Sequence, residues 1–308
     1  MSPQEVAERI HPDFHRYYLH FFTGESFSAY ASNAQAVIDV TGWHGTILDV
    51  GCGFGVFDIC LYASGVKSVV GTDLVPEKTL GATQLAALLG IRNMEFTIAS
   101  AEQLPFADAT FDGVLIKDTV SHLPASTGCY SEVFRVLRPG GSLLIIDDRN
   151  GLNPLTRWNT KKLWKVSEFG TLEQVSRLGL KSNLSELRLR YIKDHFPELS
   201  DQACRTLAIE TRGLLNRQIP EYIAARDKRS KPPQQYAQCV NPETAMIQER
   251  LLNPFQLSSQ LETIGFKTRV LPHLGRRAES NMLRNAVRML GPISAMLATS
   301  FQILATRR

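Results

Sequence analysis

The sequence predicts a doubly wound α/β fold, in which helices cover both faces of a seven-stranded, mostly parallel sheet. Short runs rich in β-branched residues alternate with stretches of helical spacing between residues 46 and 147. That alternation is typical of βαβ units, whose strands run parallel. A glycine-rich turn follows the first run directly, as it does in nucleotide-binding α/β domains. The five predicted strands of this region are TILDV, SVVGTD, MEFTIA, GVLIKD and SLLIIDD.

Changes in pattern along the chain predict four segments. Residues 1–45 are expected to form helices that cover an edge of the sheet, and residues 46–150 form the α/β core. Residues 151–253 contain several helical stretches and no convincing strand, which predicts a helical cap inserted after strand five. Residues 254–308 return to the core with a last helix and strands six and seven, FKTRVLPH and SFQILATR. The helices expected in the first segment are Phe14–Phe22 and Ser26–Val40.

The cysteines and the first residues of the chain favour a reducing, cytoplasmic location. The five cysteines are scattered, and none forms a Cys-x-x-Cys pair, so neither a disulfide framework nor a zinc site is predicted. The first residues lack the basic end and apolar run of a secretory signal.

One uncharged stretch, Met289–Thr306, has about the length of a membrane span. It contains Gly291 and Pro292 together with several hydroxyl side chains, so we interpret it as a short buried helix followed by a strand. The sequence thus predicts no membrane span and leaves peripheral association open.

Charge is distributed unevenly along the sequence. Residues 1–150 carry 9 Lys and Arg against 17 Asp and Glu, whereas residues 151–253 carry 17 against 11 and residues 254–308 carry 8 against 2. A basic second half could attract an anionic substrate, carrier or surface. Solvated helix faces explain the same charges equally well.

The glycine-rich turn has the pattern Asp49-Val-Gly51-Cys-Gly53-Phe-Gly55. Glycines at such a turn tolerate positive φ and let the backbone approach a ligand closely. The third glycine of the dinucleotide fingerprint would fall at Val56, which disfavours NAD or FAD. The Asp49 carboxylate would repel a pyrophosphate but suits the ammonium group of a methionine moiety.

A second acid, Asp73, ends the second predicted strand, 22 positions after Gly51. A carboxylate at this position can accept both hydrogen bonds of a ribose diol. An Asp after a strand is often only the cap of the next helix. Together with the glycine turn, however, Asp73 indicates a nucleoside-binding site.

These motifs resemble those of the class I S-adenosylmethionine (SAM)-dependent methyltransferases, in particular the group of ubiquinone/menaquinone and other small-molecule methyltransferases. The resemblance covers about residues 46–147 and rests on LDVGCGFG, VVGTDLVPE, SAEQLPFADATFDGV, SHLP and EVFRVLRPGGSLLI, in that order. It implies a Rossmann-like sheet, SAM as cofactor and S-adenosylhomocysteine as product. The cofactor residues that it implies are Asp49, Gly51, Cys52, Gly53 and Gly55 at the methionine end, Asp73 at the ribose, Leu74, Ala101 and Glu102 at the adenine, and Lys117 near the methionine end.

One position departs from the family pattern. Family members usually carry Asp where this chain has Ser100, and that residue often binds the adenine amino group. The resemblance therefore leaves this contact open or assigns it to Glu102.

The candidate catalytic residue is His122, which follows the fourth predicted strand at the carboxyl edge of the sheet. It could remove a proton from an attacking hydroxyl, or it could simply pack there. No metal is expected, because the methyl group of SAM is already activated by its sulfonium.

The sequence therefore predicts a SAM-dependent methyltransferase that acts on a small molecule, such as an anionic sugar, lipid or natural-product intermediate. The alternatives are a SAM-fold binding protein without turnover, a nucleic-acid or protein methyltransferase, and a dehydrogenase or epimerase. Nucleic acid is disfavoured because no Asn/Asp-Pro-Pro-Tyr/Phe motif follows strand four. The oligomeric state is not indicated.

Overall fold

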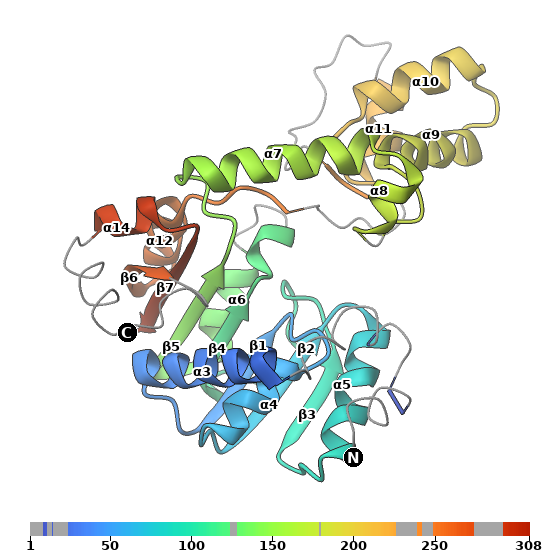
Figure 1. The fold of residues 1–308 in the computed structure, drawn as a ribbon. Helices are drawn as coiled ribbons and strands as arrows, with labels where there is room; N and C mark the ends of the chain where they lie inside the picture. The colour runs from blue at the N-terminus through green and yellow to red at the C-terminus, as the bar shows by residue number, and fades with distance from the viewer. Residues whose placement is uncertain are drawn as a thin grey trace. The chain divides into compact units, whose positions relative to one another are not determined.

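The computed structural model describes residues 9–10, 14, 24–123, 128–178, 180–225, 239–241, 249–273 and 292–308. Seven strands form one sheet in the order β3-β2-β1-β4-β5-β7-β6 (Figure 1). β7 runs antiparallel to both of its neighbours, and the remaining pairings are parallel. The predicted doubly wound α/β fold is confirmed. The strands are β1 (Thr46–Val50), β2 (Ser68–Asp73), β3 (Met94–Ile98), β4 (Phe111–Lys117), β5 (Leu137–Asp147), β6 (Phe266–His273) and β7 (Ser300–Arg307).

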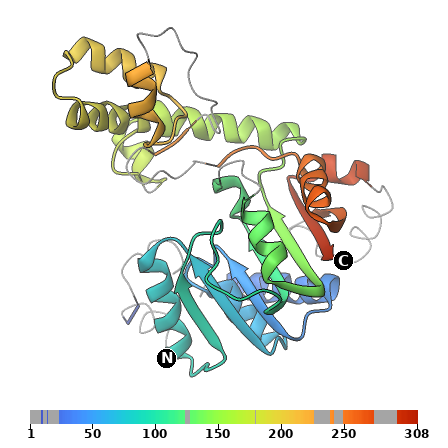
Figure 2. The ribbon, with the colours of Figure 1, turned by 180° about the vertical axis from the view of Figure 1, so that it is seen from behind.

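Helices cover both faces of the sheet. On one face, α3 (Gly24–Thr41) packs on α4 (Val56–Ala63), and on the other α6 (Gly128–Val136) packs on α12 (Pro254–Ile264), as Figures 1 and 2 show. α5 (Pro76–Leu88) packs against β2 and β3. The central strands are therefore buried on both sides, which explains why they are apolar almost without interruption.

The core of the sheet consists of side chains that solvent does not reach. Leu48 of β1, Leu115 of β4 and Ile145 of β5 are each 0% exposed. Burial of these aliphatic side chains stabilises the three central strands by roughly 1.5–3 kcal/mol per residue. The strand ends that carry the candidate site thus extend from the buried core of the domain.

The chain order reverses at β1, because β2 and β3 lie on one side of it and β4 and β5 on the other. In open α/β sheets, ligands bind beyond the carboxyl ends of the strands at this reversal. The predicted glycine turn follows β1, so it lies at that point.

The chain divides into two compact units. The first contains the sheet, and the second contains residues 121–126 and 149–252. The second unit occupies nearly the residues of the expected insertion, and the positions of the two units relative to one another are not determined. Its helices are α7 (Pro154–Phe169), α8 (Leu172–Ser176), α9 (Leu184–His195), α10 (Asp201–Glu210) and α11 (Gln218–Ala225).

Two sequence predictions concern elements near the ends of the chain. Ser26–Val40 lies within α3, whereas most of Phe14–Phe22 lies outside the described residues. The described part of the uncharged C-terminal stretch forms α14 (Pro292–Leu297) and β7. None of the helices in the described ranges combines the length and apolarity that crossing a bilayer requires.

A buried ion pair links two helices of the second unit. The guanidinium of Arg188, on α9, donates to both carboxylate oxygens of Glu168, on α7, at 2.8 and 3.2 Å. Both side chains are 1% exposed, and Arg188 also donates to the carbonyl oxygen of Ala208 at 2.9 Å. Two parallel hydrogen bonds fix the relative orientation of α7 and α9.

We predict that Arg188→Ala destabilises the protein by about 3–5 kcal/mol, because it leaves the Glu168 carboxylate buried without its main partner. Chemical denaturation followed by circular dichroism measures this loss. Arg177→Ala is the matched control, since Arg177 pairs with Glu173 on the surface, where both side chains are about three-quarters exposed. Equal effects of the two substitutions would contradict the structural role of the buried pair.

Candidate functional site

The glycine turn lies between β1 and α4 and requires a backbone that only glycine adopts readily. Gly51, Gly53 and Gly55 have φ angles of 84°, 58° and 69°. The amides of Gly51 and Cys52 both donate to the carbonyl oxygen of Thr72, at 2.7 and 2.9 Å, which fastens the turn to the end of β2. The turn is therefore held in one conformation by its neighbouring strand.

The missing side chains at two of these glycines make room for other parts of the protein. A Cβ atom on Gly51 would lie 2.3 Å from the hydroxyl of Thr119, which follows β4. At Gly55 it would lie 2.7 Å from the ring of Phe96. The sequence predicts that these glycines leave room for a ligand, whereas Thr119 and Phe96 occupy the space beside Gly51 and Gly55.

Asp73 closes β2 beside the turn and is 8% exposed. Its carboxylate accepts from the amide of Gly53 at 3.1 Å and from that of Val75 at 2.9 Å, and the Lys78 ammonium lies 3.7 Å away. A carboxylate has about four acceptor positions, so capacity remains for further hydrogen bonds. Asp73 thus connects the glycine turn to the start of α5 and can still bind a ligand.

Two large apolar side chains are exposed beside Asp73. Leu74 is 65% exposed, and Ile98, which pairs in register with Asp73, is 54% exposed. Exposed aliphatic groups at the carboxyl edge of a sheet offer a flat apolar partner to an aromatic ligand. Leu74 was predicted as a site residue, whereas Ile98 was missed because a strand isoleucine is usually in the core.

The segment after β3 contains the two other predicted adenine residues. Ala101 is half-buried and Glu102 is exposed. The hydroxyl of Ser100 accepts from the amide of Glu102 at 3.2 Å, so Ser100 shapes the local turn. The carboxylate of Glu102 is left at the surface of this segment.

Two carboxyl groups, Asp49 on β1 and Asp58 in the first turn of α4, lie buried against each other. They are 3% and 0% exposed, and each carboxyl group shifts the pKa of the other through its charge and a hydrogen bond between them. In the described part of the chain, no other hydrogen-bond donor contacts either oxygen of Asp58. A hydrogen bond between two carboxyl groups requires a proton on one of them, so we infer that the pair shares a proton.

Burial decides which group holds that proton. Burial raises the pKa of Asp58 well above its ordinary value, and the charge of Asp49 raises it further. Burial also raises the pKa of Asp49 to about 6, while the hydrogen bond from Asp58 and the charge of Lys117 oppose that rise. Asp58 therefore holds the proton more tightly than Asp49, and Asp49 carries the negative charge when the pair binds one proton.

The Lys117 ammonium adds a cation to this cluster. Lys117 ends β4, forms an ion pair with Asp118 and lies 5.5 Å from the centre of the Phe57 ring. Burial lowers its pKa, but Asp118, Tyr30 and Asp49 reverse that effect, so that the net pKa is raised. Lys117 therefore stays protonated near Asp49.

Cys52 lies in the same turn, near the carboxyl groups of Asp58, Asp49 and Asp73. Burial raises its pKa well above the ordinary value, and the charges of Asp58, Asp49 and Asp73 raise it further. Its sulfur donates weakly to the carbonyl oxygen of Gly53 at 3.6 Å. A nucleophilic role would require a lowered pKa instead.

The structure brings together Asp49, the glycine turn, Asp73 and Lys117. His122 is half-buried at the end of a short 3₁₀ helix, Val120–His122, and it belongs to the second unit. Because the two units are not placed relative to each other, its role as a base stays a prediction.

Comparison with known proteins identifies the kind of domain that contains this site. Residues 43–194 match a sequence family described as a methyltransferase domain. This match identifies residues 43–194 as a methyltransferase domain. The match includes the strand, glycine turn and acid described above.

Three relatives illustrate the range of acceptors in this group. Cycloartenol-C-24-methyltransferase 1 from Oryza sativa subsp. japonica is 34% identical over 30% of this chain and 28% of its own length. The arsenite methyltransferase of Halobacterium salinarum is 35% identical over 33% of this chain and 27% of its own. The O-methyltransferase resE of Aspergillus sclerotiorum is 28% identical over 48% and 58%. Each match spans less than two thirds of the relative, and the names differ in acceptor, so the shared segment does not identify the acceptor here.

The carboxyl pair makes stability depend on pH. Because both pKa values are raised on folding, the pair binds more protons in the folded than in the unfolded chain above about pH 4, and its contribution to stability falls as pH rises. We predict that Asp58→Asn, which keeps a donor to Asp49, flattens this fall by roughly 1 kcal/mol per pH unit between about pH 5 and pH 8.

Denaturant titrations at several pH values measure the effect. Asp39→Asn, at an exposed position on α3, is the control and should leave the pH profile parallel to that of the native protein. A parallel profile for Asp58→Asn would show that no proton is shared.

Proposed function

We propose that this methyltransferase binds SAM at the carboxyl ends of β1 and β2 and transfers its methyl group to a small-molecule acceptor. The observation that carries the proposal is the buried carboxyl group of Asp49 beside the glycine turn, with Asp73 on the adjacent strand. Neighbouring strands lie about 4.8 Å apart, so one ligand can contact both carboxylates through an amino acid and a ribose.

The residues present fit the cofactor. Apart from the Asp58 carboxyl group, no hydrogen-bond donor among the described residues contacts the buried Oδ1 of Asp49, and an ammonium group would satisfy it. The Lys117 ammonium would attract the cofactor's carboxylate, and Asp73 can accept from the ribose hydroxyls. The proposed adenine contacts are Leu74 and Ile98 on the faces and Ala101 and Glu102 on the edge.

The chain's own residues would act by holding the cofactor and orienting it toward the acceptor. When bound, SAM supplies a methyl group on a cationic sulfur, so alignment of the acceptor and exclusion of water supply much of the catalysis. Asp49, Lys117 and Asp73 would fix the two ends of the cofactor. For an oxygen or carbon acceptor we propose that the His122 imidazole takes the proton, whereas an amine can lose its proton without a dedicated base.

We further propose that the acceptor carries phosphate or carboxylate. The support is the surplus of basic residues in segment 151–253, with 17 Lys and Arg against 11 Asp and Glu. A cationic surface raises the local concentration of anionic ligands. Competition between phosphorylated acceptors and their neutral counterparts tests this, and equal turnover of the two would refute it.

Transfer of labelled methyl groups tests the activity itself. Purified protein is incubated with methyl-labelled SAM and fractionated cell extract, and label in the small-molecule fraction is the expected result. Label only in nucleic acid or protein would contradict a small-molecule acceptor. Binding of SAM without any transfer would favour a protein that has lost turnover.

We predict that Asp73→Ala weakens SAM binding by about 1.5–3 kcal/mol, the scale of hydrogen bonds to a charged group. Isothermal titration calorimetry measures the affinity, and the melting temperature recorded beside it shows whether the loss of the Gly53 and Val75 contacts disturbs the fold. Glu77→Ala, an exposed acid at the start of α5, is the matched control and should bind normally. An unchanged affinity in Asp73→Ala would contradict the ribose assignment.

A further inference from the structure

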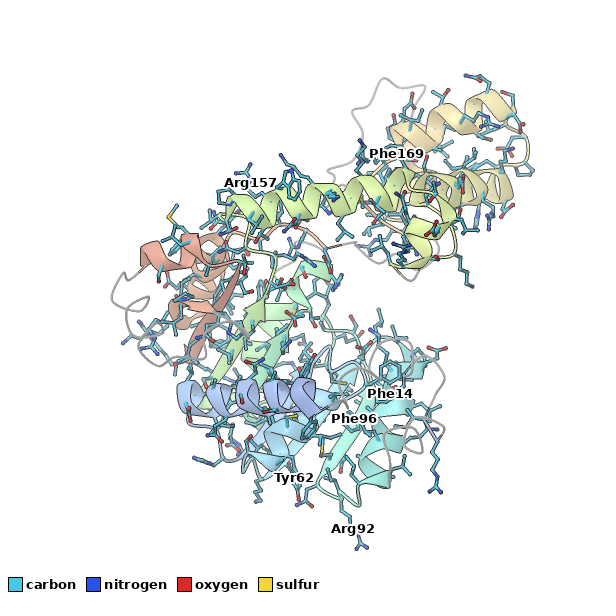
Figure 3. The ribbon with its side chains drawn as sticks, in the orientation of Figure 1. Phe14, Tyr62, Arg92, Phe96, Arg157 and Phe169 are labelled. Atoms are coloured by element: carbon cyan, nitrogen blue, oxygen red, sulfur yellow. The ribbon has the colours of Figure 1, made fainter. Side chains whose placement is uncertain are left out.

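One side of α7, in the second unit, carries exposed cations and exposed large apolar groups together. At 100° per residue, these cations and apolar groups fall within about 160° of the helix circumference. Figure 3 shows Arg157 near the start of α7 and Phe169 at its end, and these residues lie about 18 Å apart along the axis. We call this surface the α7 face; it consists of Leu155, Arg157, Trp158, Lys161, Lys162, Lys165 and Phe169.

The α7 face has four positive charges and no acid. The acid within α7, Glu168, is buried and paired with Arg188, so it does not offset these charges at the surface. The buried side of the helix holds Thr156, Thr160 and Trp164 instead. The surface is therefore strongly cationic over its whole length.

The apolar groups on the α7 face are unusually accessible. Trp158 is 62% exposed, Phe169 61% and Leu155 53%. A cation lies over each aromatic ring: the Lys162 ammonium is 5.5 Å from the Trp158 ring centre, and the Arg212 guanidinium is 5.5 Å from that of Phe169. Exposed apolar groups clustered in this way mark a binding surface more often than a solvated one.

We propose that the α7 face docks on the surface of an anionic phospholipid bilayer, with the helix axis parallel to the membrane plane. The four cations would pair with lipid phosphate and carboxylate groups, while the Trp158 indole would lie at headgroup depth. The aliphatic Leu155 has no ring to stack on a nucleobase but gains by burial at the acyl boundary, which favours lipid over nucleic acid.

Vesicle sedimentation with the full chain tests this proposal and does not depend on methyl transfer. We expect binding to phosphatidylcholine vesicles that contain phosphatidylserine, weak binding to phosphatidylcholine alone, and a decline as salt is raised. The triple variant Lys161→Gln, Lys162→Gln, Lys165→Gln should bind on the order of a hundredfold more weakly. The matched control is Lys181→Gln, Arg205→Gln, Arg217→Gln, which removes three exposed cations elsewhere in the same unit.

Tryptophan fluorescence locates the contact. The chain has three tryptophans, and Trp43 and Trp164 are buried at 4% and 7% exposure, so a blue shift on adding vesicles reports Trp158. Trp158→Phe should keep binding and lose the shift. Equal loss of binding in the two triple variants, or binding without a shift, would overturn the proposal. Tighter binding to single-stranded DNA than to vesicles would assign the face to nucleic acid instead.

Discussion

A single proton held between two buried carboxyl groups sets the electrostatics of the candidate site. Asp58 is 0% exposed and Asp49 3%, so neither can carry its charge freely, and their hydrogen bond leaves one neutral and one ionised. The bond also joins the first turn of α4 to β1, on either side of the glycine turn. The contact between Asp49 and Asp58 thus determines both the position and the charge of Asp49.

The other parts of the site are arranged around this charge. Thr72 accepts hydrogen bonds from the turn at the end of β2, and the next residue, Asp73, accepts from Gly53 within it. Lys117 approaches from β4 and partly neutralises the acids. A ligand with a positive and a negative end would satisfy both kinds of charge. The proposed cofactor has such an amino-acid end, whereas a pyrophosphate would meet only repulsion at Asp49.

Much of the sheet could be predicted because the sequence patterns that indicate its strands and turns are local. Alternating β-branched runs indicate parallel strands, and a glycine turn after the first of them indicates the ligand edge. Asp49 and Asp73 follow from their places in that pattern.

Asp58 could not be found in this way, because an acid in the first turn of a helix is ordinarily a favourable surface residue near the helix dipole. Its burial against Asp49 depends on how α4 packs on β1, which no local pattern encodes. Ile98 was missed for the opposite reason, since strand residues of its kind are usually buried and this one is 54% exposed. The exposed side of α7 likewise becomes apparent only when the buried side is known.

The central claim is that an ionised Asp49 receives the amino-acid end of the cofactor. Calorimetric binding of S-adenosylhomocysteine and of methylthioadenosine, which lacks the amino acid, tests it most directly between about pH 5 and pH 8. Because Asp49 has a pKa of about 6, S-adenosylhomocysteine should bind more weakly as pH falls below that value and should release a proton on binding there. Methylthioadenosine should show neither effect. Identical pH profiles for the two ligands would contradict the account.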